Sequence, residues 1–296
     1  MSALGFVRGH GMSDLITMDD LSNDEILEIL DAAERLLPVA NGDVYAPLLQ
    51  GKVLGNLFFE NSTRTRMSFE SAMKRLGGEV VNLSSVGSSV AKGETLYDTM
   101  QMVDGYADIA VIRHPRQGAA QYSADAIGIP ILNAGDGAGN HPTQTMLDLF
   151  TIRQDHGTIE GLNVVLVGDL RYGRTTHSLS HALVRFGAKL TLVSPDSLRM
   201  PTEIVGDLQS HGSEVIESEN LSGAIAEADV IYMTRIQKER FPDEDEYAKL
   251  AGIYKMTADD LAGAKGGMIV MHPLPRVDEI DPSVDSTKHA RYFQQA

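Results

Sequence analysis

Residues 53–76 of this chain of 296 residues read VLGNLFFENSTRTRMSFESAMKRL. The apolar run at 53–59 predicts a strand, and the periodic stretch at 65–76 predicts a helix directly after it. The same alternation continues along the chain, where further short apolar runs are separated by helical stretches. These runs lie at 80–83, 109–112 and 129–132. Strands that alternate with helices predict a parallel sheet.

A second series of strands begins near Gly161, with apolar runs at 164–167, 190–193, 230–233 and 268–271. Between the two series, Pro142–Asp155 reads as one helix, with proline at an early position where its missing N–H costs little. We therefore expect an α/β fold of two doubly wound domains, each with a central parallel sheet, joined by this bridging helix. The expected domains are 1–150 and 151–296, in keeping with the length of the chain.

The N-terminal region holds a second methionine, Met12, so residues 1–12 are expected to be a loose extension or to follow a misassigned start. Apolar residues then recur at helical spacing from Ile26 to Leu37. Pro38 is predicted to end that helix.

Composition sets the broad class of protein. With 43% apolar and 22% charged residues the chain has ordinary globular composition. No apolar run approaches the roughly 18–20 residues that cross a bilayer, and no signal pattern opens the sequence. We expect a cytoplasmic protein.

Two compositional features exclude classes of chemistry. The sequence has no cysteine, which excludes disulfides, thiolate zinc sites and cysteine nucleophiles. It has 41 acidic against 25 basic residues and a net charge of −16. That balance argues against binding to nucleic acid, which needs a basic surface.

The basic residues concentrate where predicted strands end. Ligands of open parallel sheets bind beyond the carboxyl ends of the strands. Arginine suits phosphate and carboxylate, and clustered cations attract an anionic substrate. The arginines at these exits are Arg64, Arg66, Arg113, Arg171, Arg174, Arg235 and Arg276. We expect a small, multiply anionic phosphorylated substrate in a cleft to which both domains contribute.

Each of these features also has a structural interpretation. The turn at 62–66, STRTR, could simply cap a helix through Ser and Thr, although two arginines at a helix N-terminus also favour an anion. His141, within GNHPTQ at a junction of strand and helix, could be structural or functional. Arg113, Arg235 and Arg276 could each form a salt bridge, and their shared location favours a site.

The segment 168–175, GDLRYGRT, fits the spacing of a nucleotide-binding P-loop except for Arg174 in place of lysine. A P-loop enzyme also needs a strand that ends in Asp to hold Mg²⁺, and no predicted strand supplies one. The glycine spacing also differs from the dinucleotide fingerprint. Both nucleotide interpretations are rejected.

Taken together, these motifs resemble the carbamoyltransferases, and within them the aspartate branch, from about Leu15 to the last residues. The segments FFENSTRTR (58–66) and HPTQ (141–144) resemble signatures of the whole family. Those resembling the aspartate branch are KGET (92–95), GDLRYGRT (168–175), YMTRIQKER (232–240) and HPLPR (272–276). The ornithine branch typically has cysteine in a His-Cys-Leu-Pro segment, where this chain has Pro273.

The resemblance implies a role for each site residue. Carbamoyl phosphate would be bound by Ser62, Thr63, Arg64, Thr65, Arg113, His141, Gln144 and the carbonyls of Leu274 and Pro275. Among these, Arg64, Thr65, Arg113, His141 and Gln144 would be catalytic. Aspartate would be bound by Lys92, Arg174, Thr175, Arg235 and Gln237. Ser88 and Lys92 would reach the site of a neighbouring subunit in a homotrimer.

The implied activity is transfer of a carbamoyl group to the α-amine of L-aspartate, an early step of pyrimidine biosynthesis, with no metal or organic cofactor. Regulatory chains are possible partners. The alternatives are transfer to a different amino acid and a catalytically silent homologue that binds ligand. The family usually continues into a C-terminal helix that returns to the first domain, and we expect this helix to be missing after Ala296.

Overall fold

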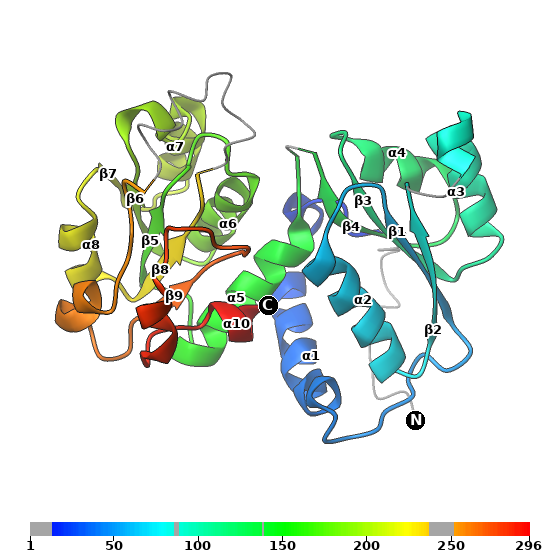
Figure 1. Ribbon diagram of the computed structural model, residues 1–296, viewed down its shortest axis with the longest axis horizontal. Helices are drawn as coiled ribbons and strands as arrows, with labels where there is room; N and C mark the ends of the chain where they lie inside the picture. The colour runs from blue at the N-terminus through cyan, green and yellow to red at the C-terminus, as the bar shows by residue number, and fades with distance from the viewer. Residues whose placement is uncertain (1–13, 86–88, 138, 237–251) are drawn as a thin grey trace. The chain divides into compact units, whose positions relative to one another are not determined.

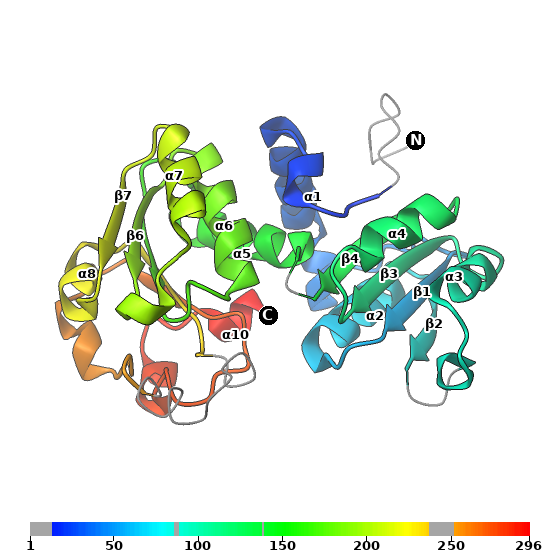
Figure 2. The same ribbon diagram turned by 90° about the horizontal axis from the view of Figure 1, so that it is seen from above.

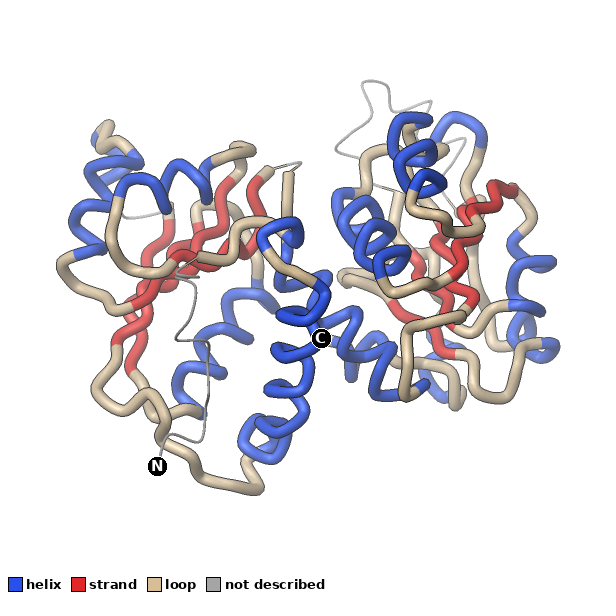
Figure 3. The backbone as a smooth tube through the Cα atoms, turned by 180° about the vertical axis from the view of Figure 1, so that it is seen from behind, coloured by secondary structure: helices blue, strands red, loops and turns tan. Residues whose placement is uncertain are grey.

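The computed structural model describes residues 14–85, 89–137, 139–236 and 252–296 (Figure 1). The chain divides into two compact units, Met1–Thr143 and Gln144–Ala296. Each unit is built on one parallel sheet with helices on its faces (Figure 3), which confirms the expected α/β class. The domain boundary expected at 150/151 stays a prediction.

The first unit has a sheet of four parallel strands in the order β2-β1-β3-β4 (Figure 2). Its strands are β1 (Val53–Phe58), β2 (Glu79–Ser84), β3 (Ile109–His114) and β4 (Ile131–Asp136). The inner strands β1 and β3 are apolar because helices cover both of their faces. All of these strands were expected from the apolar runs. β4 begins later than expected, at Ile131, directly after Pro130.

Two separate cores hold the helices against this sheet. On one face, α2 (Thr63–Arg75) buries Met73 against Leu54 and Phe58 of β1. On the other face, α3 (Leu96–Asp104) and α4 (Ala119–Ala126) contribute Met100 and Ala120. The sheet therefore has its strand ends, rather than its faces, available for ligands.

Helix α1 (Asn23–Asn41) contains Pro38, so the expectation that Pro38 ends the helix was wrong. Pro38 lacks the N–H that would bond the Glu34 carbonyl, so α1 forgoes one hydrogen bond there and still continues as far as Asn41. The helix ends instead at Gly42, whose φ of 84° is a left-handed cap conformation. At its other end, Ser22 and Glu25 form a capping box.

The second unit has a sheet of five parallel strands in the order β7-β6-β5-β8-β9. Its strands are β5 (Asn163–Val167), β6 (Lys189–Val193), β7 (Val215–Ser218), β8 (Val230–Met233) and β9 (Ile269–Met271). β7 was not predicted. It is a short edge strand whose Ile216 is exposed, so it lacks the apolar run that marks its neighbours.

Helices cover the second sheet in the same way. They are α5 (Pro142–His156), α6 (Arg174–Arg185), α7 (Thr202–Ser210), α8 (Leu221–Glu227) and α10 (Tyr292–Gln295).

Short 3₁₀ turns occur in both units. They are η1 (Met18–Asp20) and η2 (Ser89–Lys92) in the first, and η3 (Asp196–Leu198), η5 (Asp259–Gly263) and η6 (Pro282–Ser286) in the second. Val165 and Val167 of β5 pack in one core with Ile225 of α8. The helix expected at 142–155 is α5. Within the described ranges, no helix is both long and apolar enough to span a membrane.

Candidate active site

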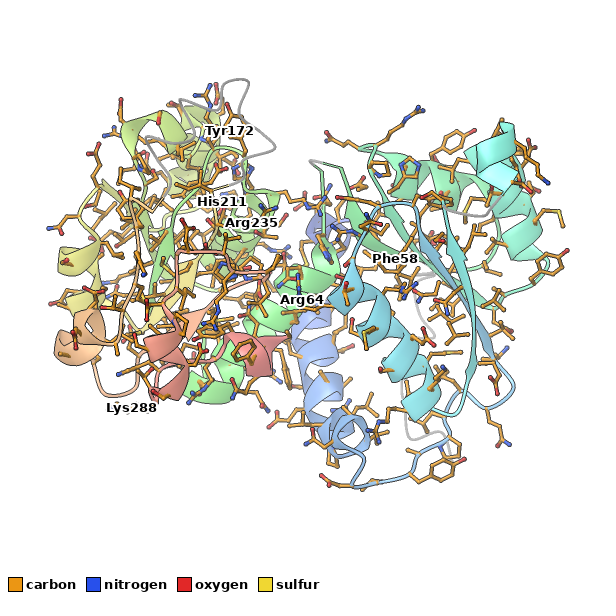
Figure 4. The ribbon with its side chains drawn as sticks, in the orientation of Figure 1. Phe58, Arg64, Tyr172, His211, Arg235 and Lys288 are labelled. Carbon is orange, nitrogen blue, oxygen red and sulfur yellow. The ribbon has the colours of Figure 1, made fainter. Side chains whose placement is uncertain are left out.

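In the first unit, Ser62 stands at the N-cap of α2 without acting as a cap. Its backbone is extended, but its side chain makes no capping hydrogen bond to the described part of α2. The first backbone N–H groups of any helix lack partners within the helix. Together with Arg64, which lies exposed in the first turn (Figure 4), they form a site suited to an anion. The capping interpretation of this turn is therefore not supported.

Arg113 lies at the end of β3, with a side chain only 12% exposed. Its Nη1 atom donates to the Ala134 carbonyl at 3.1 Å, and its Nη2 atom lies 3.5 Å from Oε1 of Glu60. Among the described residues, its Nε atom has no hydrogen-bond partner.

Burial and two neighbouring charges, those of Glu60 and Arg64, act on the pKa of Arg113. Burial lowers the pKa of Arg113, Glu60 acts to raise it, and the positive charge of Arg64 lowers it further. Arginine stays charged in proteins, so Arg64 and Arg113 repel each other. An anion bound near both guanidinium groups would relieve that repulsion.

His141 follows a loop that two buried polar residues hold in place. Oδ1 of Asp136 accepts from the Asn140 N–H at 2.7 Å, and Oδ2 accepts from Gly118 N–H at 2.8 Å. Asn133 donates to the Asn140 carbonyl at 3.3 Å. His141 itself is buried, and its Nδ1 lies 3.3 Å from the Thr143 hydroxyl.

In the second unit, the segment after β5 is shaped by close backbone contacts. Gly168 has φ +116°, and a Cβ there would lie 2.4 Å from the Thr234 carbonyl oxygen. A Cβ on Gly173 would lie 2.5 Å from the Asp169 carbonyl oxygen. Gly168 is therefore required by packing against the loop that follows β8, and Gly173 by a close contact within its own loop.

These loops carry the residues expected to bind a dicarboxylate. Arg174 and Thr175 begin α6, and Arg235 follows β8 (Figure 4). All three side chains are half-buried. Lys92 is exposed at the end of η2 in the first unit. Gln237 and Ser88 lie outside the described residues.

The segment after β9 presents backbone carbonyls. The Leu274 N–H donates to Nδ1 of His272 at 2.7 Å, so the proton of this imidazole is on Nε2. That Nε2 donates to Oε1 of Glu279 at 2.6 Å. Burial lowers the pKa of His272, which keeps the ring neutral. Leu274 has φ +52° and precedes a cis bond to Pro275, so His272 supports an uncommon backbone conformation there.

Two of the arginines at strand exits are engaged inside the second unit. Arg276 bonds Asp285 through both terminal nitrogens, and its guanidinium lies 5.3 Å from the centre of the Tyr292 ring. Arg171 donates to the Ser197 carbonyl at 3.3 Å. The salt-bridge interpretation holds for Arg276.

Sequence profiles of one family match nearly the whole chain. Residues 13–154 match the profile described as aspartate/ornithine carbamoyltransferase, carbamoyl-P binding domain, and residues 160–296 match that of the Asp/Orn binding domain.

The chain belongs to the aspartate/ornithine carbamoyltransferase family.

Relatives within this carbamoyltransferase family are similar along almost their full length. The aspartate carbamoyltransferase catalytic subunit of Archaeoglobus fulgidus is 56% identical over 286 residues, which are 96% of this chain and 94% of that protein. The protein of the same name from Methanothrix thermoacetophila is 56% identical over 283 residues, 95% of this chain and 92% of the relative.

Solved structures of aspartate transcarbamoylases have the same fold as this chain. The catalytic subunit of M. jannaschii aspartate transcarbamoylase has a TM-score of 0.90 at 50% identity, covering 96% of this chain and 93% of its own. The Trypanosoma cruzi aspartate transcarbamoylase in complex with carbamoyl phosphate and aspartate has a TM-score of 0.90 at 41% identity, covering 96% and 92%.

Several residues that build this carbamoyltransferase site were not found from the sequence. Asn133 and Asp136 hold the loop before His141, and Asp148 is a fully buried acid on α5. Polar residues at the end of β4 were a usable signal for the first two. The burial of Asp148 could not be predicted from a local pattern, because two of its three partners, Tyr232 and Gln295, are far away in the sequence.

Proposed function

We propose that this chain is a catalytic subunit that transfers the carbamoyl group of carbamoyl phosphate to the α-amine of L-aspartate. The products are N-carbamoyl-L-aspartate and phosphate, and the step belongs to pyrimidine biosynthesis. The observation that carries the proposal is the 56% identity to an aspartate carbamoyltransferase catalytic subunit over 96% of the chain. The geometry of both units supports it.

The first unit supplies the groups that suit the phosphate. We assign Ser62, Thr63, Arg64 and Thr65, at the start of α2, to the phosphate, with Arg113 adding charge. The backbone N–H groups and the mutual repulsion of Arg64 and Arg113 favour a dianion here. Residues 1–150 are accordingly the proposed carbamoyl phosphate domain.

The carbamoyl group itself meets donors on one side and acceptors on the other. Thr65, Arg113 and His141 are assigned to the carbonyl oxygen, where negative charge develops as the amine attacks. Donors placed there in advance contribute roughly 10²–10³ in rate each. Gln144 and the carbonyls of Leu274 and Pro275 are assigned to the amino group.

Arg174, Thr175, Arg235 and Gln237 are the proposed ligands of the two aspartate carboxylates, in the domain 151–296. Two arginines suit a dicarboxylate and oppose the cationic side chain of ornithine. Pro273, in place of the cysteine typical of the ornithine branch, agrees with this choice.

The reaction follows from these positions. The neutral amine of aspartate attacks the carbamoyl carbon, the C–N bond forms, and the C–O bond to phosphate breaks. The departing phosphate takes the proton of the amine. Holding two anions in one orientation supplies much of the remaining rate, because they repel each other in water.

We further propose a cytoplasmic homotrimer in which Ser88 and Lys92 enter the site of a neighbouring subunit. Regulatory chains are a proposed partner because the relatives are named catalytic subunits.

The test is an assay of carbamoyl transfer with aspartate and ornithine side by side. Carbamoyl-aspartate should form rapidly and carbamoyl-ornithine should not. Equal or better use of ornithine would reject the assignment of the second substrate. Binding of carbamoyl phosphate without any transfer would identify a silent homologue.

A further inference from the structure

Asp148 is a fully buried carboxylate at the centre of the second unit. Its Oδ1 accepts from Nε2 of Gln144 at 2.9 Å and from Nε2 of Gln295 at 2.6 Å. Its Oδ2 accepts from the Tyr232 hydroxyl at 2.9 Å. These three donors are neutral, so the carboxylate is held by hydrogen bonds, although burying a charge in this way is costly. A residue kept at such a cost invites a functional explanation.

The first consequence concerns Gln144, which lies one helical turn before Asp148 on α5. In its ionised form Asp148 can only accept hydrogen bonds, so it selects the amide nitrogen of Gln144. The amide oxygen of Gln144 is then directed away from Asp148. Asp148 therefore determines that Gln144 offers an acceptor.

The second consequence concerns the segment after β9. Gln295 donates to Asp148 through Nε2 and accepts from the His272 N–H through Oε1 at 2.9 Å. His272 in turn accepts from the Leu274 N–H. One chain of hydrogen bonds thus connects Asp148 to the backbone that carries the carbonyls of Leu274 and Pro275.

We propose that Asp148 and Gln295 are positioning residues that make this part of the site accept hydrogen bonds only, and so select a substrate with an amino group over one with a methyl group. The inference rests on the proposed function, which assigns Gln144, Leu274 and Pro275 to the amino group of carbamoyl phosphate. An NH₂ group supplies two donors to these oxygens. A methyl group supplies none and leaves buried acceptors without partners.

Acetyl phosphate is the matched probe, because it has a methyl group where carbamoyl phosphate has its amino group. Its transfer to aspartate forms a C–N bond and breaks the C–O bond to phosphate, which leaves with the amine proton. The product is N-acetyl-aspartate, so both reactions are followed by their amino acid products. The ratio of kcat/KM for the two acyl phosphates measures the selection directly.

The decisive variant is Asp148→Asn. Asparagine at this position offers a donor as well as an acceptor, so the Gln144 amide is free to reverse and present its NH₂ to the substrate. We expect the carbamoyl-to-acetyl ratio to fall roughly tenfold or more, the loss of about one hydrogen bond. The control is Asp155→Asn on the same helix, whose carboxylate bonds Arg291 at 2.8 Å. Its ratio should stay at the wild-type value.

A merely structural role for Asp148 would lower kcat/KM for both acyl phosphates in proportion, and an unchanged ratio would overturn the proposal. Should Asp148→Asn fail to fold, Gln295→Met removes both hydrogen bonds of Gln295 at similar volume, and its ratio should fall as well. The same ratio is available from calorimetric binding of the two acyl phosphates, which needs no turnover. Wild-type protein that binds carbamoyl phosphate selectively but does not carbamoylate aspartate would contradict the proposed function and support this inference.

Discussion

Oε1 of Glu60 lies 3.5 Å from Nη2 of Arg113, so a carboxylate stands beside the cation assigned to the substrate phosphate. Glu60 offsets part of the positive charge that would attract an anion. We predict that Glu60→Gln binds inorganic phosphate several-fold more tightly at low salt, and that salt screening shrinks the gain. Isothermal calorimetry at two ionic strengths measures both effects.

The control for this variant is Glu79→Gln. Glu79 is exposed at the start of β2. It therefore lies at the opposite end of the parallel strands from the carboxyl ends where Arg113 lies. Its removal changes the net charge equally and should leave phosphate binding nearly unchanged. Weaker binding by Glu60→Gln would show that Glu60 supports Arg113 rather than competing with phosphate.

Arg64→Ala should abolish measurable carbamoyl transfer, because it removes a cation from the start of α2 where the phosphate is assigned. Arg75→Ala, at the other end of α2, is the matched control and should retain activity. Steady-state kinetics give the comparison, and size-exclusion chromatography should show the same assembly for all proteins. Near-normal turnover by Arg64→Ala would remove the basis of the phosphate assignment.

Mixing two inactive variants tests the shared site. If Lys92 acts in the site of a neighbouring subunit, trimers reassembled from Lys92→Ala and Arg64→Ala chains contain some sites with both residues intact. Activity should therefore return on mixing, measured as carbamoyl-aspartate formed per trimer. Reassembled hybrid trimers without activity would place Lys92 in its own subunit's site.

Asp148 predicts a distinct pH dependence of stability. Burial raises its pKa to about 7, only partly offset by the hydrogen bonds from Gln295, Tyr232 and Gln144. A raised carboxyl pKa stabilises the fold fully below the ordinary value near 4, and this contribution is lost as pH rises through 7. Between pH 5 and 8 the wild type should lose roughly 2–3 kcal/mol of unfolding free energy that Asp148→Asn does not lose.

Urea unfolding of both proteins across that pH range measures the difference. Glu279 does not obscure it. Burial acts to raise the pKa of Glu279, but hydrogen bonds from His272 and from backbone N–H groups lower it to about 2. Its contribution is therefore constant between pH 5 and 8. Parallel stability curves for wild type and Asp148→Asn would show that the carboxylate is already ionised throughout.

The sequence predicts most of the fold because buried parallel strands are apolar on both faces and stand out as short runs. β7 escapes because an edge strand with an exposed Ile216 carries no such run. Pro38 misleads because α1 tolerates the loss of the one hydrogen bond that the proline cannot donate and ends only at Asn41.

The site divides along a similar line. Arg64 and Arg113 are predictable because residues at strand exits converge at one edge of a parallel sheet. Arg276 follows the same rule and yet bonds Asp285, a partner that only the folded chain reveals. Asp148 and Gln295 are out of reach of local patterns, since they meet only once β8, β9 and α10 have packed around α5.

Helix α2 begins at a residue of capping type whose hydroxyl does not cap it. A bound phosphate that accepts from the first N–H groups would do for α2 what a serine or aspartate does for other helices. The first turn of α2 should then fray less when carbamoyl phosphate is bound than when it is absent. Protease cleavage at the start of α2 should therefore slow as carbamoyl phosphate is added, because the bound substrate stabilises this part of the folded protein.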